Sequence, residues 1–236
     1  GQIVTQQDAT GTQEFFYNPL GAMVKINRVI IIPDNPTLTY TTQWTYDTWN
    51  RVTGMIYPDG EQLTYNYNLG GLLQKMSGIK SGTTYNYLPR MGYDKFEANV
   101  YKRYGNGSEM TFTYNAERRR LQNLTAKTAA NRFAMNNTYT YDKEENILRV
   151  VNDAPVPPSN LMGGKSDYQY TYDDLYRVTN MNGKFGGSSN EQRYTVAMSY
   201  NTVSSIISKS QVHEKKAYNA TNWVLQNQTS YNYNYN

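Results

Sequence analysis

The sequence predicts an all-β protein made of consecutive antiparallel hairpins. The dipeptides Tyr-Asn and Tyr-Asp recur along the chain and include 14 of its 24 tyrosines. Around them, apolar and polar residues alternate with a period of two, as in strands that have one drier face. No stretch has a convincing helical period. Residues 117–128 come nearest, and we expect them not to form a helix.

The repeating unit is clearest in residues 44–53 and 170–179. Both read as a strand that ends at Tyr-Asp, a short polar turn, and Arg-Val-Thr at the start of a second strand. An Asp or Asn after the tyrosine is expected to end the strand, because its short side chain accepts hydrogen bonds from nearby backbone N–H groups. The unit therefore predicts one antiparallel hairpin, and irregular spacing of its copies indicates loops of variable length.

A second kind of turn joins the units to one another. In Tyr57-Pro58-Asp59-Gly60, proline presets φ and glycine accepts positive φ, so a tight turn is predicted before a strand over residues 62–68. The residues that define the repeat structurally are Tyr46, Asp47, Arg51, Pro58, Asp59, Gly60, Tyr114, Asn115, Tyr141, Asp142, Tyr172, Asp173 and Arg177.

The whole chain, residues 1–236, is expected to be a single repeat array. Pro- and Gly-rich loops are predicted near residues 152–165 and 183–190, and residues 29–32 read as a short buried strand. The last residues stop within a regular alternation, which suggests a piece of a much longer protein. Any secretion signal would lie upstream, since the first residues have neither a basic start nor an apolar core.

Composition excludes several classes of function. The net charge of +4 is mild, and basic residues form no stripe, so nucleic acid is not an expected partner. No apolar run is long enough for a membrane span. The absence of cysteine removes disulfides, thiol catalysis and cysteine-based zinc sites. The single histidine, His213, excludes a multi-histidine metal site and is expected at the surface.

No catalytic, cofactor or metal site is predicted. Asp173 and Asp174 are adjacent in a strand or turn, so their side chains point apart, and Asp173 has a place in the turn. Residues 163–166 look like the end of a phosphate-binding loop, but Pro158 stands where that motif needs its first glycine. We therefore expect a protein that is not an enzyme and needs no cofactor.

These recurring motifs resemble the RHS/YD-repeat family. The resemblance covers about residues 15–236 and is carried by Tyr-Asp with Arg-Val-Thr, by Tyr-Pro-Asp-Gly and by Tyr-Gly-Asn-Gly. It implies a large, exported bacterial protein whose repeats wind into a curved spiral sheet that closes as a hollow shell. In relatives with a toxin, the shell encloses a C-terminal toxin domain. The self-cleaving core of such relatives has no good counterpart here; residues 18–21 come nearest, with Asn in place of Asp.

The resemblance thus implies a structural, encapsulating role in a secreted or cell-surface protein. The partners would be the rest of the same shell-forming chain and an enclosed toxin domain. The alternative is a cell-surface adhesin or carbohydrate-binding region, in which exposed tyrosines stack on glycans. Most tyrosines are expected to serve the fold instead, with rings packed between repeat layers and hydroxyls bonded across strands.

Overall fold

The computed structural model describes residues 1–158, 164–186, 190–217 and 219–235, which form nineteen strands and no helix. The all-β prediction is therefore confirmed. The segment with the nearest helical pattern, residues 117–128, contains strand β12 instead (Leu121–Lys127). None of these residues belongs to a helix that is long and apolar enough to cross a membrane.

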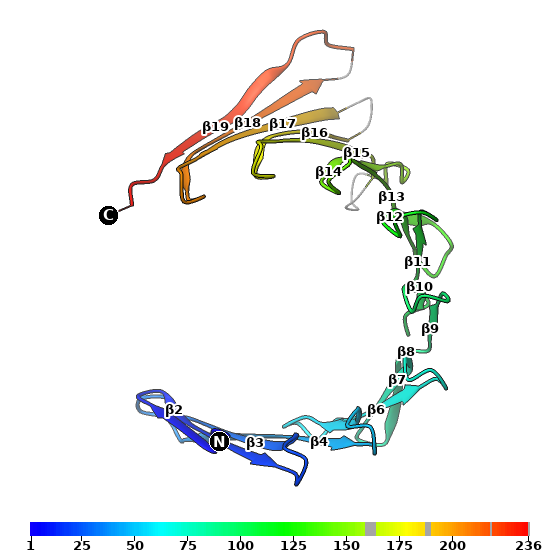
Figure 1. The fold of residues 1–236 in the computed structure, drawn as a ribbon, viewed down its shortest axis with the longest axis vertical. Coiled ribbons are helices and arrows are strands. Elements are labelled where there is room, and N and C mark those ends of the chain that lie inside the picture. The colour runs from blue at the N-terminus through cyan, green and yellow to red at the C-terminus, as the bar shows by residue number, and fades with distance from the viewer. Residues whose placement is uncertain (159–163, 187–189, 218, 236) are drawn as a thin grey trace. The chain divides into compact units, whose positions relative to one another are not determined.

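The chain divides into two compact units, Gly1–Gly107 and Ser108–Asn236. In the first unit, strands β1 to β8 form an antiparallel sheet in the order of the sequence, and β9 pairs with β10 (Figure 1). The strands are β1 (Thr5–Asp8), β2 (Gly11–Tyr17), β3 (Met23–Ile30), β4 (Leu38–Tyr46), β5 (Val52–Ile56), β6 (Gln62–Tyr67), β7 (Leu73–Lys80), β8 (Thr83–Leu88), β9 (Arg90–Tyr93) and β10 (Asn99–Arg103).

In the second unit, strands β11 to β19 also follow one another in sequence order, each antiparallel to the next (Figure 1). The strands are β11 (Glu109–Tyr114), β12, β13 (Phe133–Tyr141), β14 (Ile147–Asn152), β15 (Ser166–Tyr172), β16 (Val178–Phe185), β17 (Asn190–Tyr200), β18 (Ile206–Ala217) and β19 (Val224–Asn232). Since every strand pairs with its sequence neighbours, consecutive hairpins alone account for this order.

Two of the expected loops fall partly on residues that the structure does not describe. Of the loop expected near residues 152–165, the described parts lie between β14 and β15 and form no strand, whereas residues 159–163 are outside the described residues. The loop expected near 183–190 is shorter, because β16 extends to Phe185 and β17 begins at Asn190. Residues 187–189, Tyr218 and Asn236 are also outside the described residues.

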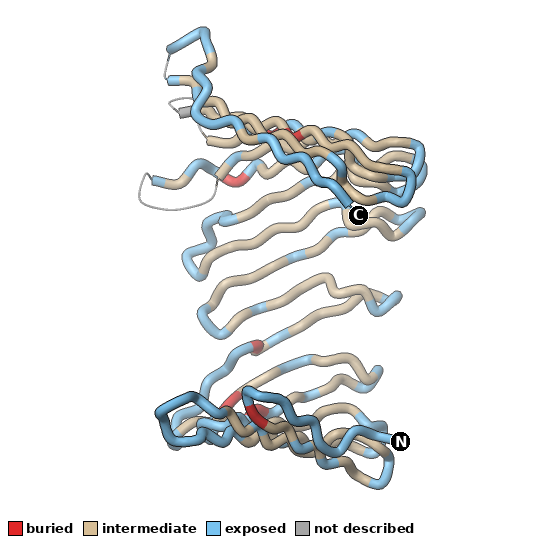
Figure 2. The backbone as a smooth tube through the Cα atoms, turned by 90° about the vertical axis from the view of Figure 1, so that its left-hand side faces the viewer, coloured by how far each residue is buried: buried red, intermediate tan, exposed pale blue. Residues whose placement is uncertain are grey.

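Within each unit the strands form a single layer with almost no interior. Figure 2 shows few buried residues along the backbone, and the buried apolar side chains are those of Leu63, Leu88, Ala154 and Val196. The prediction of a buried strand over residues 29–32 is wrong: β3 ends at Ile30, and Ile31 and Ile32 are 51% and 41% exposed. A single layer offers no second sheet that could cover such a run.

The two faces of each sheet differ in chemistry. In β15, Tyr168, Tyr170 and Tyr172 are half-buried and lie on one face, while Gln169 and Thr171 are exposed on the other. We call these the tyrosine face and the threonine face. Tyrosine rings therefore lie on one face of a single layer, and the expectation that they pack between layers is wrong within each unit. On the threonine face, threonine hydroxyls of neighbouring strands bond to each other, as between Thr171 and Thr179 (Oγ1 to Oγ1, 3.2 Å).

Candidate functional site

The Tyr-Asp turn after β4 shows how one repeat is built. The backbone N–H of Asn50 donates to the carbonyl of Asp47 at 3.0 Å, and the N–H of Asp47 donates to the carbonyl of Arg51 at 3.0 Å. Carboxylate oxygen Oδ1 of Asp47 accepts the N–H groups of Trp49 (2.9 Å) and Arg51 (3.0 Å). The aspartate thus satisfies two backbone donors that the tight turn would otherwise leave without a partner.

The fourth residue of this turn has positive φ. In the Asp47 turn it is Asn50, at φ 61°, and the ladder register shifts by one residue between Thr45 and Tyr46. This is a three-residue hairpin loop, with a left-handed residue that forms a bulge. The corresponding residues with positive φ in the other Tyr-Asn and Tyr-Asp turns are Gly21, Gly71, Glu97, Arg119, Glu145, Tyr176 and Ser204.

The same capping recurs along the described chain. In each of these turns the side-chain Oδ1 of the Asp or Asn accepts the backbone N–H of the residue that begins the return. The donors are Ala22 to Asn18, Arg51 to Asp47, Leu72 to Asn68, Ala98 to Asp94, Arg120 to Asn115, Asn146 to Asp142, Arg177 to Asp173 and Ser205 to Asn201, at 2.8–3.1 Å. Only the Asn115 turn is one residue longer.

In six repeats the tyrosine hydroxyl joins its hairpin to the preceding one. The hydroxyl of Tyr172, at the end of β15, donates to the carbonyl of Ile147, the first residue of β14, at 2.7 Å. Equivalent bonds join Tyr46 to Met23, Tyr67 to Val52, Tyr93 to Leu73, Tyr141 to Leu121 and Tyr200 to Val178, at 2.6–2.8 Å. The ladder between β14 and β15 ends at Arg149 and Gln169, two residues before Ile147, so the hydroxyl supplies a partner to a carbonyl that no strand pairing satisfies on that side.

Burial affects the acidity of these hydroxyls. It raises the pKa of Tyr93, Tyr141 and Tyr172 above the usual value of 10.0. All three hydroxyls are therefore protonated at neutral pH and can donate to their carbonyls. We call the series of tyrosine hydroxyl bonds the tyrosine ladder.

In the Asp47 and Asp173 turns, an arginine four residues later forms an ion pair with the capping aspartate. Nε of Arg177 donates to Oδ2 of Asp173 at 2.7 Å, and its second nitrogen Nη2 lies 2.7 Å from the same oxygen. The Arg177 guanidinium lowers the pKa of the Asp173 carboxyl below its usual 3.8. Arg51 and Asp47 have the same geometry; desolvation alone would raise the pKa of Asp47, but hydrogen bonds from Arg51 and Trp49 lower it.

The same arginines contact the next hairpin. The Arg177 guanidinium lies 4.6 Å from the ring centroid of Tyr200 and also donates through Nη1 to the carbonyl of Asn201 and to Oγ of Ser204, both at 3.1 Å. Arg120 lies 4.9 Å from the Tyr141 ring and donates to the carbonyl of Asp142 at 2.9 Å. Each of these arginines is thus a cation that stacks on the next tyrosine of the array.

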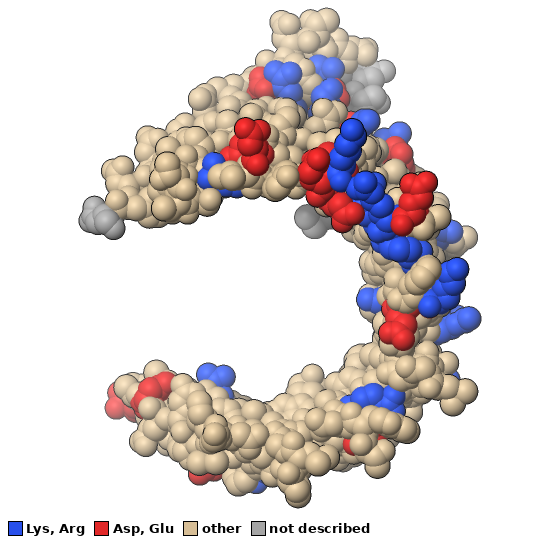
Figure 3. All heavy atoms as spheres, viewed as in Figure 1, with Lys and Arg blue, Asp and Glu red and all other residues tan. Residues whose placement is uncertain are grey.

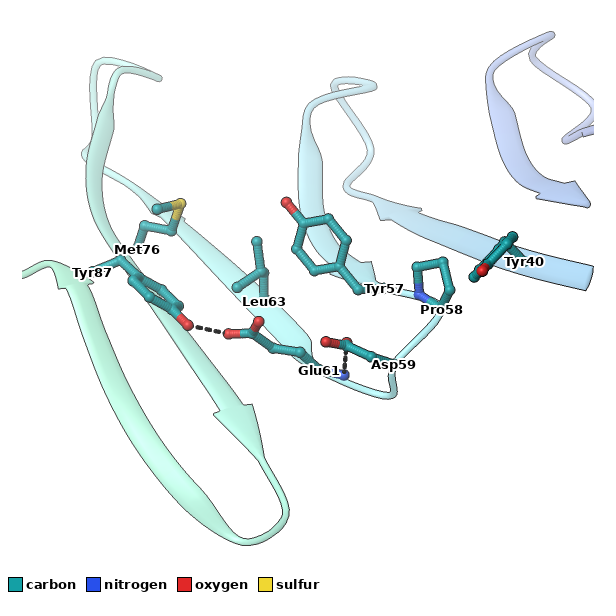
Figure 4. A pocket seen from close by; sticks show the side chains of 8 residues that line it. All are labelled: Tyr40, Tyr57, Pro58, Asp59, Glu61, Leu63, Met76 and Tyr87. Carbon is teal, nitrogen blue, oxygen red and sulfur yellow. Dashed lines mark hydrogen bonds between the residues drawn. The ribbon is translucent and has the colours of Figure 1, made fainter. Parts of the chain in front are cut away.

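One groove of the first unit is not explained by the repeat contacts. It has a volume of about 680 Å³ and lies on the tyrosine face beside the turn that joins β5 to β6 (Figure 4). Its walls are formed by Tyr40, Tyr57, Pro58, Asp59, Glu61, Leu63, Met76 and Tyr87. This size is typical of small-molecule and side-chain binding sites. We call it the tyrosine groove.

Two carboxylates stand in the tyrosine groove. Asp59 accepts the Glu61 N–H at 3.1 Å and pairs with Nζ of Lys80 at 2.5 Å. Glu61 accepts a hydrogen bond from the Tyr87 hydroxyl, which Figure 4 shows on the side of the groove away from Pro58. This bond to Glu61 raises the pKa of Tyr87 to about 12. Pro58, Asp59 and Gly60 form the expected turn, with Gly60 at φ 85°.

The residues set aside as catalytic candidates lie apart from this groove. His213 lies in β18, half-buried, where its ring stacks on Tyr194 at 4.4 Å and Nε2 lies 2.7 Å from Oε1 of Gln192. Asp173 caps its turn, and Asp174 is exposed beside it. Gly163 of the phosphate-loop-like stretch is outside the described residues. Within the described ranges no three His, Cys, Asp or Glu side chains gather as a metal site.

Comparison with known proteins places this fold. No protein family in the comparison matches the chain. Toxin subunit YenC1 of Yersinia entomophaga is 28% identical over 133 residues, which make up 50% of this chain and 13% of that protein. The crystal structure of TcdB2–TccC3–Cdc42 matches 98% of this chain with a TM-score of 0.78 at 18% identity. The chain has an RHS-type repeat fold.

Two further solved structures match the chain with similar TM-scores. The Tc holotoxin pore of Photorhabdus luminescens matches 98% of this chain with a TM-score of 0.76 at 18% identity, and TcdB2–TccC3 matches 95% with a TM-score of 0.75 at 16% identity. The resemblance to YD-repeat proteins is thereby confirmed. This chain spans only 12–13% of the length of these proteins.

Proposed function

We propose that this RHS-type chain is a stretch of shell wall in a secreted or cell-surface bacterial protein related to toxin-complex subunits. The shell would enclose a C-terminal toxin domain or another cargo, and the chain's partners would be the rest of its own shell and that cargo. Support comes from the likeness to a toxin subunit and to Tc toxin structures.

One observation carries this proposal: the hairpins are linked side by side without a core. In each unit the strands form a single layer, and few side chains are buried. Stability must then come from strand pairing and the tyrosine ladder, which recur along the array, and from arginine stacks at some of the hairpins. Such local, repeating contacts let an array extend to any length. A wall needs this property, whereas a globular enzyme needs a closed core.

The turn carboxylates support a structural role rather than catalysis. Asp173 is occupied by two backbone N–H groups and by Arg177, so it is neither free as a base nor placed beside a nucleophile. Asp47 is bound in the same way. In the proposal this chain therefore performs no chemical step.

Limited proteolysis with intact-mass readout, on the protein as its source organism makes it, tests the proposal. If the chain is shell wall, it survives as part of a far larger resistant particle that releases a C-terminal fragment only on denaturation. A free species of the mass of this chain, about 27.2 kDa, would contradict encapsulation.

A carbohydrate-binding surface is the second candidate, and the tyrosine groove is the observation in its favour. Tyr40, Tyr57 and Tyr87 are 41%, 38% and 38% exposed, and aromatic faces beside carboxylates can hold a sugar. A glycan array probed with the chain tests this reading. It requires binding that a Tyr57→Leu substitution abolishes.

A further inference from the structure

The tyrosines of the groove lack the stacked cation that several other tyrosines of this chain have. Arg51 stacks on Tyr67 at 4.5 Å, and the ladder residues Tyr141 and Tyr200 have their own arginines at 4.9 and 4.6 Å. Within the described part of the chain, no Lys or Arg stacks on the rings that line the groove, those of Tyr40, Tyr57 and Tyr87. These rings are also among the more exposed aromatic groups.

The groove has an unbalanced negative charge. Asp59 is neutralised by Lys80, which contacts its Oδ2. Glu61 has no ion-pair partner among the described residues; its Oε1 accepts the Tyr87 hydroxyl, and its Oε2 accepts no hydrogen bond there. One carboxylate oxygen in a groove lined by three exposed rings is therefore available for a donor. An aromatic face beside a free carboxylate is the environment in which a guanidinium is bound by stacking and by charge at once.

We propose that the tyrosine groove binds an arginine side chain of an extended peptide segment, with the guanidinium stacked on a groove tyrosine and paired with Glu61. The repeat itself supplies the precedent, because Arg177 is held in this way between the carboxylate of Asp173 and the ring of Tyr200. The inference rests on the proposed function in one respect: the segment that supplies the arginine would belong to the enclosed cargo.

Charge favours this occupant over a neutral sugar. A sugar would use the rings and the hydrogen-bonding capacity of Glu61 but would leave its charge unbalanced in a partly apolar groove, which is unfavourable. A guanidinium balances that charge. Arginine also fits better than lysine, since its planar group stacks on aromatic faces and is more weakly hydrated.

Titration of the full 236-residue chain with two short Gly/Ser peptides tests the proposal. One peptide has a central arginine, and the other has citrulline, which keeps the shape and loses the charge. Binding is followed by NMR shifts of groove residues. Glu61→Gln keeps an acceptor for the Tyr87 hydroxyl and removes the charge, and we expect it to weaken arginine-peptide binding about 5-fold, as for a pair worth about 1 kcal/mol. Tyr57→Leu is expected to weaken it as well.

Glu117→Gln is the matched control, because Glu117 is exposed in the turn before β12 and the substitution changes the net charge equally. It should leave binding unchanged. Equal binding of the citrulline peptide, equal binding to Glu61→Gln, no binding to the unaltered chain, or a neutral glycan that binds the groove where the peptide does not would each overturn the proposal. Thermal unfolding of each variant separates loss of the site from loss of the fold. Proteolysis of the whole protein tests encapsulation independently of this titration.

Discussion

The Asp47 turn of the first unit and the Asp173 turn of the second are alike inside and differ outside. Both carboxylates cap the same two backbone positions, and both pair with an arginine four residues later at 2.7 Å. Arg177, however, donates to Asn201 and Ser204 of the next turn, whereas no hydrogen bond joins Arg51 to its next turn in the described structure.

The cause lies at the left-handed position of the next turn. That position is Ser204 after Arg177 and Gly71 after Arg51. Serine supplies a hydroxyl to the guanidinium, while glycine lets the guanidinium come so close that a Cβ on Gly71 would lie 3.0 Å from Nη1 of Arg51. The comparison teaches that the repeat motif fixes each hairpin, and that one residue of the following turn decides how neighbouring hairpins are joined.

Charged side chains of opposite sign also lie beside each other over the second unit (Figure 3).

The largest expected effect on stability comes from substitutions at these two positions, Gly71 and Ser204. Gly71→Ala places a Cβ at φ +83° and against Arg51, and should lower the free energy of unfolding by about 1–2 kcal/mol. Ser204→Gly relieves a positive φ and loses one hydrogen bond, so its effect should stay within about 0.5 kcal/mol. Urea unfolding measures both. Similar losses for the two variants would contradict the comparison.

Removal of a ladder hydroxyl should have a similar effect in both units. Tyr67→Phe and Tyr172→Phe each leave a carbonyl, that of Val52 or Ile147, without its donor, at an expected cost of about 1 kcal/mol. Tyr231→Phe is the control, because Tyr231 is 44% exposed and its hydroxyl makes no hydrogen bond to any residue that the structure describes. If all three variants unfolded at the same urea concentration as the unaltered chain, the tyrosine ladder would not be a stabilising element.

Replacement of arginine by lysine should destabilise the Asp173 turn more than the Asp47 turn. Lysine cannot hold the aspartate and the next turn together, so Arg177→Lys loses contacts with Asn201 and Ser204. Arg51→Lys loses only planar stacking and the fork on Asp47. We expect the melting temperature to fall more for Arg177→Lys than for Arg51→Lys, and an equal or reversed order would refute the role of the following turn.

The smallest effect is expected from pH. The pKa of Asp173 is lowered in the folded chain by Arg177, so its stabilising contribution is present above its unfolded value of about 3.8 and is lost as the pH falls through the lower folded value. Asp173→Asn should remove this part of the acid dependence, as turns that already have asparagine, such as those of Asn68 and Asn201, cannot supply it. Thermal melts between neutral and acid pH compare the variant with the unaltered chain.

Much of this architecture could be predicted from the sequence, because its determinants are local. Alternation and the Tyr-Asp dipeptide indicate where a strand ends, since the aspartate captures backbone donors two and four residues away. The partner of the tyrosine hydroxyl could not be identified, because Ile147 lies 25 residues from Tyr172 and its carbonyl is available only because the ladder between β14 and β15 ends at Arg149. The positive φ of Asn50 and Tyr176 could not be predicted either, because glycine, the usual sign of such a conformation, is absent at both positions.

The tyrosine groove was also beyond sequence reasoning. Tyr57 and Glu61 belong to a turn that was recognised, but Tyr40 and Tyr87 come from strands that only the register of the sheet brings beside it. A signal did exist in the sequence, since Glu61 has no basic residue at the spacing at which Asp47 has Arg51. Burial was misjudged over residues 29–32 because a run of apolar residues normally implies a core, and a single-layer sheet has none.

Cysteine labelling of the two faces in the full-length protein tests the central claim most directly, since this chain has no cysteine of its own. Leu148→Cys, on the tyrosine face of β14, and Thr171→Cys, on the threonine face of β15, lie on neighbouring strands. If the chain is shell wall, a bulky polymer-linked maleimide reacts with only one of the two in the intact protein, and with both after denaturation. Equal reaction of both cysteines in the intact protein would contradict the account.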